Sequence, residues 1–405
     1  MSAQNRSDSA RSASPRHVDR LVIGGGPAGA MVALHLASAG RSVVLIEKES
    51  GPHHKVCGEF LSREAVDYLH QAGVDPLELG ASVITSLRLS SGDKLIAALL
   101  PFQALSLSRR VLDAALLARA EEAGCDVVRG VAVESLIPSG PGGPGSDDWL
   151  ASLSNGDSVR ASSVFLASGK HDLRGFTRSP ARQSGLVGFK MHWRLASSQI
   201  HALRDCMHLY LFSGGYGGLS LIEGGVANLC LVVRRSTLQS SGGWPQLLAS
   251  ILRGHRHLRR LLDGAAPLWP RPLAISPIPY GYLIRESRGL WCVGDQAAVI
   301  PSFTGDGISI ALHSAALAAQ MFLAGHNAAD YNRTLHAQLF RSMALATWLS
   351  RTAVTAAGRT AALAALSLAP SAIRWVAAST RIPQSSLVLD QCALQRAGII
   401  ARPTA

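Results

Sequence analysis

The sequence has few lysines and no paired cysteines. Only five of its 39 basic residues are lysine, so the net charge of +12 is carried mainly by scattered arginines. No recognised nucleic-acid motif accompanies them, and we expect no nucleic-acid partner. The six cysteines show neither CxxC pairs nor the His/Cys spacing of metal sites. We therefore expect reduced thiols, no bound metal and a cytoplasmic location.

Long apolar runs are also missing. The Ala-rich segment 352–378 is interrupted by Arg359 and Arg374, and the uncharged run of 14 residues between them is too short to span a bilayer. This segment predicts a packed helical hairpin, with peripheral contact to a membrane surface as the alternative. Residues 1–17 are rich in Ser, Arg and Ala and predict a disordered tail without a signal peptide.

The most informative segment, 18–47, reads VDRLVIGGGPAGAMVALHLASAGRSVVLIE. An apolar strand leads into a glycine-rich turn, a small-residue helix and a second strand that ends in Glu47. Gly24 permits the tight turn, Gly26 lets the backbone approach a pyrophosphate, and Gly29 allows close helix packing. A carboxylate at Glu47 can accept hydrogen bonds from ribose hydroxyls. The segment therefore predicts a dinucleotide site formed by Gly24, Gly26, Pro27, Ala28, Gly29, Glu47 and Lys48.

A second glycine-bearing motif lies in residues 290–312, LWCVGDQAAVIPSFTGDGISIAL. Asp295, at the end of a strand, can bind a sugar-like hydroxyl such as those of a flavin ribityl chain. The following glycines can bring backbone N–H groups and a helix N-terminus to the flavin pyrimidine edge. An NAD dehydrogenase needs no such motif, so FAD is the predicted cofactor. The predicted contacts are Gly294, Asp295, Pro301, Gly305, Gly307 and Ile308.

With Cys57-Gly58-Glu59-Phe60-Leu61-Ser62, Arg109-x-x-Leu112-Asp113 and Ala167-Ser168-Gly169, these motifs resemble the FAD-dependent oxidoreductases that include para-hydroxybenzoate-type hydroxylases and geranylgeranyl reductases. The resemblance implies an α/β fold: an FAD-binding ββα-sandwich (Rossmann-like, glutathione-reductase-type), an inserted antiparallel β-sheet substrate domain and a C-terminal helical segment. It adds Arg109 and Gly169 to the predicted cofactor contacts. The predicted bounds are 18–83, 103–175 and 276–330 for the FAD-binding domain, 84–102 and 176–275 for the substrate domain, and 331–405 for the C-terminal helices.

Five residues are candidates for the reaction, and Glu59 is a further residue with two possible roles. Cys57 lies where related reductases place a Cys-Gly pair beside the flavin, although a small residue needed for packing is an equal alternative. Lys190 and His192 share one strand face, which could bind a phenolate, carboxylate or phosphate. The favoured alternative for that face is plain solvent exposure. Tyr216 and Phe303 could line an apolar pocket. Glu59 is either an acid in the pocket or, as favoured, a carboxylate at the N-terminus of the helix after Ser62.

The electron donor is less well indicated. Hydroxylases of this kind usually carry an Asp-Gly pair where this chain has Gly169-Lys170-His171-Asp172, and no second GxGxxG follows a strand. NADPH or NADH is therefore expected only as a transient donor.

The resemblance leaves the reaction open. Hydroxylation of a phenolic or polyketide product by a monooxygenase, through a flavin hydroperoxide, is the favoured prediction, because the motifs are also similar to flavoproteins of polyketide and phenolic-lipid biosynthesis. Reduction of a C=C bond in an isoprenoid or polyketide lipid is the alternative. A halogenase is disfavoured since the Trp-x-Trp-x-Ile-Pro signature is missing, and an electron-transfer flavoprotein since no cluster-binding cysteines are found. The expected substrate is a small aromatic or lipid-like molecule, and the expected protein a monomer or dimer.

Overall fold

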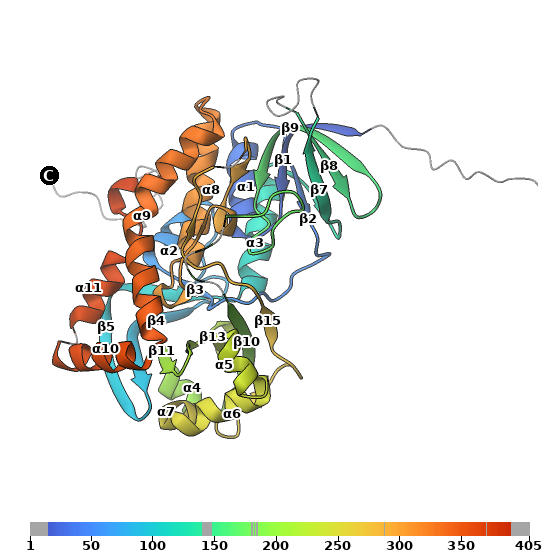
Figure 1. Ribbon diagram of the computed structural model, residues 1–405. Helices are drawn as coiled ribbons and strands as arrows, with labels where there is room; N and C mark the ends of the chain where they lie inside the picture. The colour runs from blue at the N-terminus through green and yellow to red at the C-terminus, as the bar shows by residue number, and fades with distance from the viewer. Residues whose placement is uncertain are drawn as a thin grey trace, which may run out of the picture.

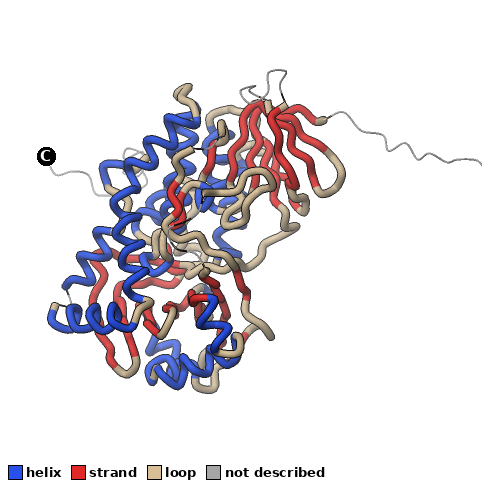
Figure 2. Tube along the Cα trace, viewed as in Figure 1, coloured by secondary structure: helices blue, strands red, loops and turns tan. Residues whose placement is uncertain are grey.

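The computed structural model describes residues 15–139, 148–179, 181, 183, 185–286, 288–369 and 371–389. A parallel-stranded sheet with its helices forms the upper part of the view in Figure 1, and a second, larger sheet lies below it. Long helices from the C-terminal part of the chain run down one side and join the two parts. Figure 2 shows that loops gather where the two sheets approach each other.

The first sheet has seven strands in the order β6-β2-β1-β9-β8-β7, and β17 pairs with β9. The pairs β2–β6, β1–β2, β1–β9 and β9–β17 are parallel, whereas β7, β8 and β9 form an antiparallel meander. This is the arrangement expected for a ββα-sandwich. The strands are β1 (Arg16–Ile23), β2 (Val44–Glu47), β6 (Asp126–Arg129), β7 (Val133–Pro138), β8 (Trp149–Leu153), β9 (Ser158–Leu166) and β17 (Trp291–Cys292).

The second sheet has nine strands in the order β14-β10-β13-β12-β11-β4-β5-β3, and β15 pairs with β10. All its pairs are antiparallel except β4 with β11. Its strands are β3 (Phe60–Leu61), β4 (Ser82–Ser91), β5 (Lys94–Ser106), β10 (Leu186–Arg194), β11 (Asp205–Phe212), β12 (Gly215–Leu221), β13 (Ala227–Arg234), β14 (Ala266–Pro267) and β15 (Leu273–Ile275). A small pair, β16 (Tyr282–Leu283) and β18 (Ala298–Val299), lies apart.

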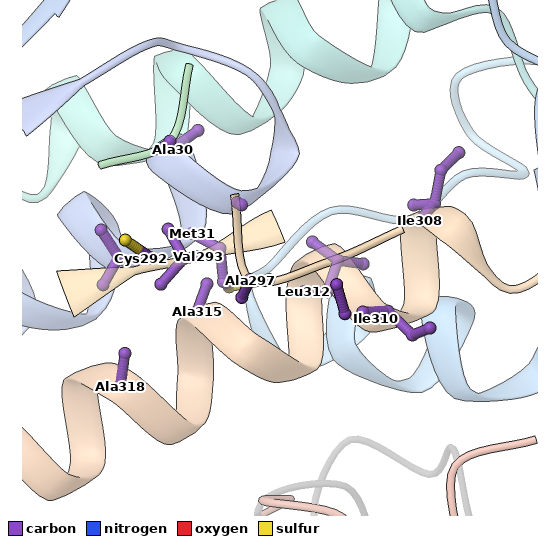
Figure 3. Close-up of a cluster of buried hydrophobic side chains, with 14 of the residues drawn as sticks. Ala30, Met31, Cys292, Val293, Ala297, Ile308, Ile310, Leu312, Ala315 and Ala318 are labelled. Atoms are coloured by element: carbon purple, nitrogen blue, oxygen red, sulfur yellow. The ribbon is translucent and has the colours of Figure 1, made fainter. Parts of the chain in front are cut away.

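Three helices pack together behind the first sheet: α1 (Pro27–Ser38), α3 (Arg109–Glu122) and α8 (Gly307–Leu323). Figure 3 shows α1 and α8 in contact through small and branched side chains. Met31 of α1 and Ala315 and Ala318 of α8 are fully buried at this contact. Alanine lets the helix backbones approach closely, and this places the N-termini of α1 and α8 near each other.

The remaining helices cover the second sheet or form the C-terminal segment. They are α2 (Arg63–Gln71), α4 (Ser197–Leu203), α5 (Arg235–Ser240), α6 (Trp244–Gly254), α7 (Arg256–Leu262), α9 (Ala328–Ala353), α10 (Ala356–Leu368) and α11 (Ser371–Ser379). Among the described residues, no single helix is long and apolar enough to cross a membrane. The helix pair 356–368 and 371–386 is long and apolar enough when the two parts are taken together, judged by length and composition alone. The pair is bent by 117° at the break between them.

The predicted fold class is confirmed, with shifts at several predicted bounds. Residues 1–14 lie outside the described part of the chain, but the prediction that 16–17 belong to a disordered tail is wrong. Both are in β1, where Arg16 pairs with Val159 and His17 with Arg160. Strand β5 continues to Ser106, and β3 also joins the second sheet, so this sheet includes residues assigned to the FAD-binding domain. Local patterns did not reveal these pairings because partners far along the chain determine them.

A buried hydrogen-bonded chain through His313 ties the C-terminal segment to α2, α8 and α9. The Val388 N–H donates to the Tyr68 hydroxyl at 2.9 Å, and this hydroxyl lies 2.8 Å from His313 Nδ1. His313 Nε2 lies 2.9 Å from the Gln338 side-chain oxygen. A neutral imidazole that accepts at Nδ1 and donates at Nε2 satisfies these contacts. Burial lowers the pKa of His313 to about 4 from an ordinary 6.5.

We expect this histidine to make the protein sensitive to acid. The unfolded chain binds a proton at His313 below pH 6.5, while the folded chain resists until about pH 4. The contribution of neutral His313 to the free energy of unfolding is therefore complete above pH 6.5 and is lost as the pH falls towards 4. Its amplitude is about 3 kcal/mol. Denaturant unfolding across this range should show a shallower pH dependence for His313→Gln. An unchanged slope would contradict the assignment.

Candidate functional site

A central cavity of about 520 Å³ lies between the two sheets. The turn after β1 contributes Gly24, Gly26, Pro27 and Ala28 to its wall, and the distant turn after β17 contributes Gly294, Asp295, Gly305, Gly307 and Ile308. The two motifs that the sequence analysis placed on one cofactor thus face the same cavity. Glu47, Lys48, Arg109 and Gly169 also line it, whereas Gly29 and Pro301 do not.

Gly29 has a packing role instead. A Cβ atom at this position would lie 1.8 Å from the Gly24 carbonyl oxygen. Gly24 itself has a φ of 105°, and its own added Cβ would lie 2.6 Å from the Ala167 carbonyl oxygen. The turn can therefore form only with glycine at both positions. Pro301 is buried, and its carbonyl accepts a hydrogen bond from the Thr304 hydroxyl, which shapes the second turn.

The carboxylate of Glu47 marks one end of the cavity. It is buried and accepts hydrogen bonds from the N–H groups of Gly25, at 2.6 Å, and Glu49, at 3.1 Å. These bonds fix the carboxylate at the end of β2, beside the glycine-rich turn. A ribose placed there would find hydrogen-bond acceptors for its hydroxyls, as the sequence predicts.

Positive charge surrounds the N-terminus of α1, where unpaired backbone N–H groups and the helix dipole favour an anion. Arg109 Nη2 would lie 3.4 Å from a Cβ on Gly26. Its guanidinium forms two hydrogen bonds with Asp113, at 2.7 and 2.8 Å, and Lys55 contacts the same carboxylate at 3.1 Å. Two cations share one anion here, so a net positive charge is left to face a phosphate. Only 15% of the Arg109 side chain is exposed, so the residue forms part of the cavity wall and is not free at the surface.

The opposite end of the cavity carries an ion pair. Asp295 accepts a hydrogen bond from Lys170 at 2.9 Å. Lys170 belongs to the segment that departs from the hydroxylase Asp-Gly pattern, and it now has a structural partner. Beyond it, Gly305 has a φ of 78°, and its added Cβ would lie 2.5 Å from the Phe60 ring. The N-terminus of α8, at Gly307, follows directly and opens onto the cavity.

Glu59 is the buried residue that connects these parts. Its side chain accepts hydrogen bonds from Lys190 and, at 2.8 Å, from the Arg109 backbone N–H, and it lies 3.1 Å from His192 Nε2. Burial would raise the pKa of Glu59, but His192 and Lys190 outweigh burial and hold this pKa below its ordinary value. Glu59 adopts a left-handed φ of 59°, a strained conformation for a residue with a side chain. The cluster therefore holds an ionised carboxylate at the wall of the cavity.

The prediction that Lys190 and His192 share one strand face is confirmed, but the interpretation of that face as solvent-exposed is wrong. Both side chains are buried, and neither lines the central cavity. The 57–60 segment covers them, since Glu59 forms the ion pair. The favoured role of Glu59 at the helix after Ser62 is also wrong, because it bonds to the first residue of α3 instead. The pairing joins positions 131 residues apart, so no local pattern could reveal it.

Among the described residues, one group of side chains could hold a metal ion, and Glu59 belongs to it. Ligand atoms of His54, Glu59 and His192 lie within 4.8 Å of one another. Lys190 already neutralises the carboxylate, and burial, then Lys190 and His192, lower the pKa of His54 to about 4. A second cation would meet repulsion there, so a metal-free site stays our prediction.

A second cavity, of about 220 Å³, adjoins the first and is lined mainly by aliphatic side chains. Gly58, Phe60, Cys230, Ser302 and Gly305 line both cavities. Strands β4, β11 and β12 form one wall of this apolar cavity, and α9, α10 and α11 form the other. Tyr216 and Phe303 line it, with ring centroids 5.9 Å apart, whereas Cys57 lines the central cavity.

Three hydroxyl groups lie where the two cavities meet. Ser302 Oγ is 3.0 Å from the Tyr216 hydroxyl and accepts a hydrogen bond from Tyr280 at 2.7 Å. Burial raises the pKa of both tyrosines, so each is a neutral phenol. The sequence analysis did not select Ser302 or Tyr280, because they lie 22 positions apart in two segments of ordinary composition. Their signal was the proximity of Ser302 to the second glycine motif.

Comparisons with known proteins agree with this geometry. A family model described as an FAD-binding domain matches residues 17–142. The menaquinone reductase of Mycolicibacterium smegmatis is 26% identical over 329 residues, which cover 78% of each chain. The digeranylgeranylglycerophospholipid reductase of Methanoculleus marisnigri is 27% identical over 75% of this chain and 76% of the relative. The matched domain and these relatives identify the chain as an FAD-dependent oxidoreductase.

The solved structures show the same oxidoreductase fold. A geranylgeranyl bacteriochlorophyll reductase-like protein of Thermoplasma acidophilum has a TM-score of 0.71, with 18% identity over 96% of this chain and all of that one. The central cavity suits the cofactor of such an oxidoreductase. Glu47 would hold the ribose, α1 and Arg109 the pyrophosphate, Asp295 the ribityl chain, and α8 the flavin head.

Proposed function

We propose that this oxidoreductase reduces a C=C bond of a polyprenyl-bearing lipid or quinone. The observation that supports the proposal most directly is the aliphatic cavity that meets the flavin cavity at Gly58 and Cys230. A chain of isoprene units is apolar along its length, and burial in such a cavity is favourable at about 25 cal/mol per Å². The named activities of the two sequence relatives support the same substrate class.

Bound FAD in its reduced form would supply a hydride to one carbon of the double bond. The other carbon then needs a proton. Tyr216, Ser302 and Tyr280 form a chain of hydroxyls at the junction of the cavities, and neutral phenols can donate. The apolar walls formed by Leu87, Leu209 and Leu211 exclude water around the alkene. The apolar walls thus position the lipid, and the hydroxyl groups deliver the proton.

Hydroxylation of a phenolic lipid is the second candidate. The edge-to-face pair of Tyr216 and Phe303 supports it, because an aromatic ring could pack against these side chains. The same hydroxyl chain could accept the phenolic proton. Such a reaction needs oxygen, which the reduction does not.

The two reactions are distinguished by their products. The holoenzyme is reduced with dithionite under nitrogen and mixed with menaquinone carrying an unsaturated side chain, or with a geranylgeranyl glycerolipid. We expect the reaction to proceed without oxygen and to give products whose polyprenyl side chain is heavier by two hydrogens, detected by mass spectrometry after any quinol has been reoxidised to the quinone in air. An alkylresorcinol in air tests the second candidate, for which the product gains one oxygen atom. If every polyprenyl compound is recovered unchanged, the reduction is refuted.

Filling the apolar cavity should block turnover and spare the cofactor. Gly218 lines the cavity, and a Cβ added there would meet Met207 and Leu209 at 3.4 and 3.5 Å, which are ordinary contacts. The longer side chain of Gly218→Leu would occupy the space of the substrate. We expect kcat/KM to fall at least about tenfold, roughly 1.4 kcal/mol, with unchanged FAD content. Gly218→Ala is the matched control, and full activity of the leucine variant would exclude this cavity.

A further inference from the structure

We propose that the C-terminal face of the protein docks onto an anionic lipid bilayer. This face comprises the exposed residues of α9, α10 and α11 together with the β4–β5 hairpin. Figure 1 shows these elements gathered at the lower left of the molecule, and β5 and α11 are in contact. The proposal concerns where the protein works and does not depend on which reaction it catalyses.

Large apolar side chains are exposed on this face. Trp348 on α9 is 62% exposed, Leu368 at the end of α10 is 88% exposed, and Trp375 on α11 is 61% exposed. Leu99 on β5 adds a further side chain at 70%. Tryptophan prefers the boundary between lipid headgroups and acyl chains, because its ring is apolar and its N–H is polar. A set of this kind on three adjacent helices is typical of interfacial binding.

The charge on this face is mainly positive, since Asp330 in the first turn of α9 pairs with Arg333, and Asp93 in the turn of the β4–β5 hairpin pairs with Arg256. Residues 331–389 contain six arginines and neither aspartate nor glutamate. Arg341, Arg351 and Arg374 are exposed. On α9, Phe340, Arg341, Trp348 and Arg351 fall within one stripe of about 100° at 100° per residue, so apolar and basic groups share a face. Anionic headgroups would neutralise this charge while the tryptophans enter the lipid.

The apolar cavity lies directly beneath this face. Leu349 of α9, Leu366 of α10 and Ile373 of α11 line its outer wall. A lipid that leaves the bilayer through these helices would enter the cavity without crossing water. Arg381 follows α11 and bonds to Asp306, the residue before α8, at 2.6 Å. The helices that would contact lipid are therefore anchored to the turn that faces the flavin cavity.

The proposal is tested by vesicle flotation of the holoprotein. We expect it to float with vesicles of phosphatidylcholine and phosphatidylglycerol, and about tenfold less with phosphatidylcholine alone. The double variants Trp348→Ser/Trp375→Ser and Arg341→Gln/Arg374→Gln should each lose about tenfold in binding. Matched controls away from this face are Ile137→Ser/Leu77→Ser, at 53% and 48% exposure, and Arg41→Gln. The flavin absorbance spectrum and gel filtration verify that each variant is folded.

Three outcomes would overturn the proposal. The first is equal binding to both vesicle types, and the second is unchanged binding of both double variants. The third is a protein that does not bind vesicles but forms a dimer, which the tryptophan substitutions dissociate. The last result would assign the face to a second copy of the chain. Flotation measures no turnover, so a failure here leaves the proposed reaction untouched, and inactivity towards polyprenyl compounds leaves the docking surface untouched.

Discussion

Gly29→Ala should deprive the protein of its FAD. The added Cβ would lie 1.8 Å from the Gly24 carbonyl oxygen, which belongs to the backbone of the turn that faces the cofactor. Relief of this overlap requires the turn to move by more than an ångström, away from the position in which it can approach the pyrophosphate. We expect FAD binding to weaken at least about 100-fold, or roughly 2.7 kcal/mol. Flavin absorbance per mole of purified protein and a fluorescence titration with FAD measure the effect.

Gly51→Ala is the control for that experiment. An added Cβ at Gly51 meets no atom within 4 Å, and its φ is not in the left-handed region. This variant should bind FAD like the natural protein. A Gly29→Ala protein that is purified with its full complement of FAD would show that the glycine-rich turn does not hold the cofactor.

Lys190→Met should cause the largest loss of stability. The substitution preserves the length of the side chain but removes the cation that neutralises Glu59, and both residues are fully buried. A buried carboxylate without its ion partner costs about 3–5 kcal/mol. Urea unfolding at saturating FAD should show a decrease of this size in the free energy of unfolding. Exposed Lys94→Met is the control and should change it by less than about 0.5 kcal/mol.

The second substitution Glu59→Gln sharpens this test. In Lys190→Met/Glu59→Gln the buried charge is gone, and His192 can still bond to the amide oxygen. We expect the double variant to recover a large part of the lost stability, as in other exchanges of buried ion pairs for neutral groups. Equal instability of the single and double variants would mean that packing around Lys190, not charge, is responsible.

The sequence allowed prediction of features that local chemistry determines. The turns at Gly24 and Gly305 need backbone conformations that glycine adopts easily, so their motifs could be recognised without the fold. The shared face of Lys190 and His192 follows from strand alternation alone. What covers that face does not, because Glu59 reaches it only through a strained 57–60 segment whose position depends on β5 and α3.

The same limit applies to the apolar cavity. The segment 352–378 was predicted as helical hairpin from its composition, and α10 and α11 confirm the helices. Their apolar faces complete a wall opposite β4, β11 and β12, which belong to a sheet far away in the sequence. Similarly, Tyr216 and Ser302 meet because β12 and the turn before α8 approach each other, and no spacing rule relates these two segments.

The order of the strands has a consequence for biogenesis. Strand β1 emerges from the ribosome early, but strand β17 of the same sheet, which pairs with β9, and helix α8 are synthesised only after the whole second sheet. A nascent chain would therefore hold the adenylate end of the site long before any residue for the isoalloxazine end exists. Cofactor capture should be a late, nearly post-translational event. In cells short of riboflavin, we expect a protein to accumulate in which the second sheet is folded but the FAD-binding part is not.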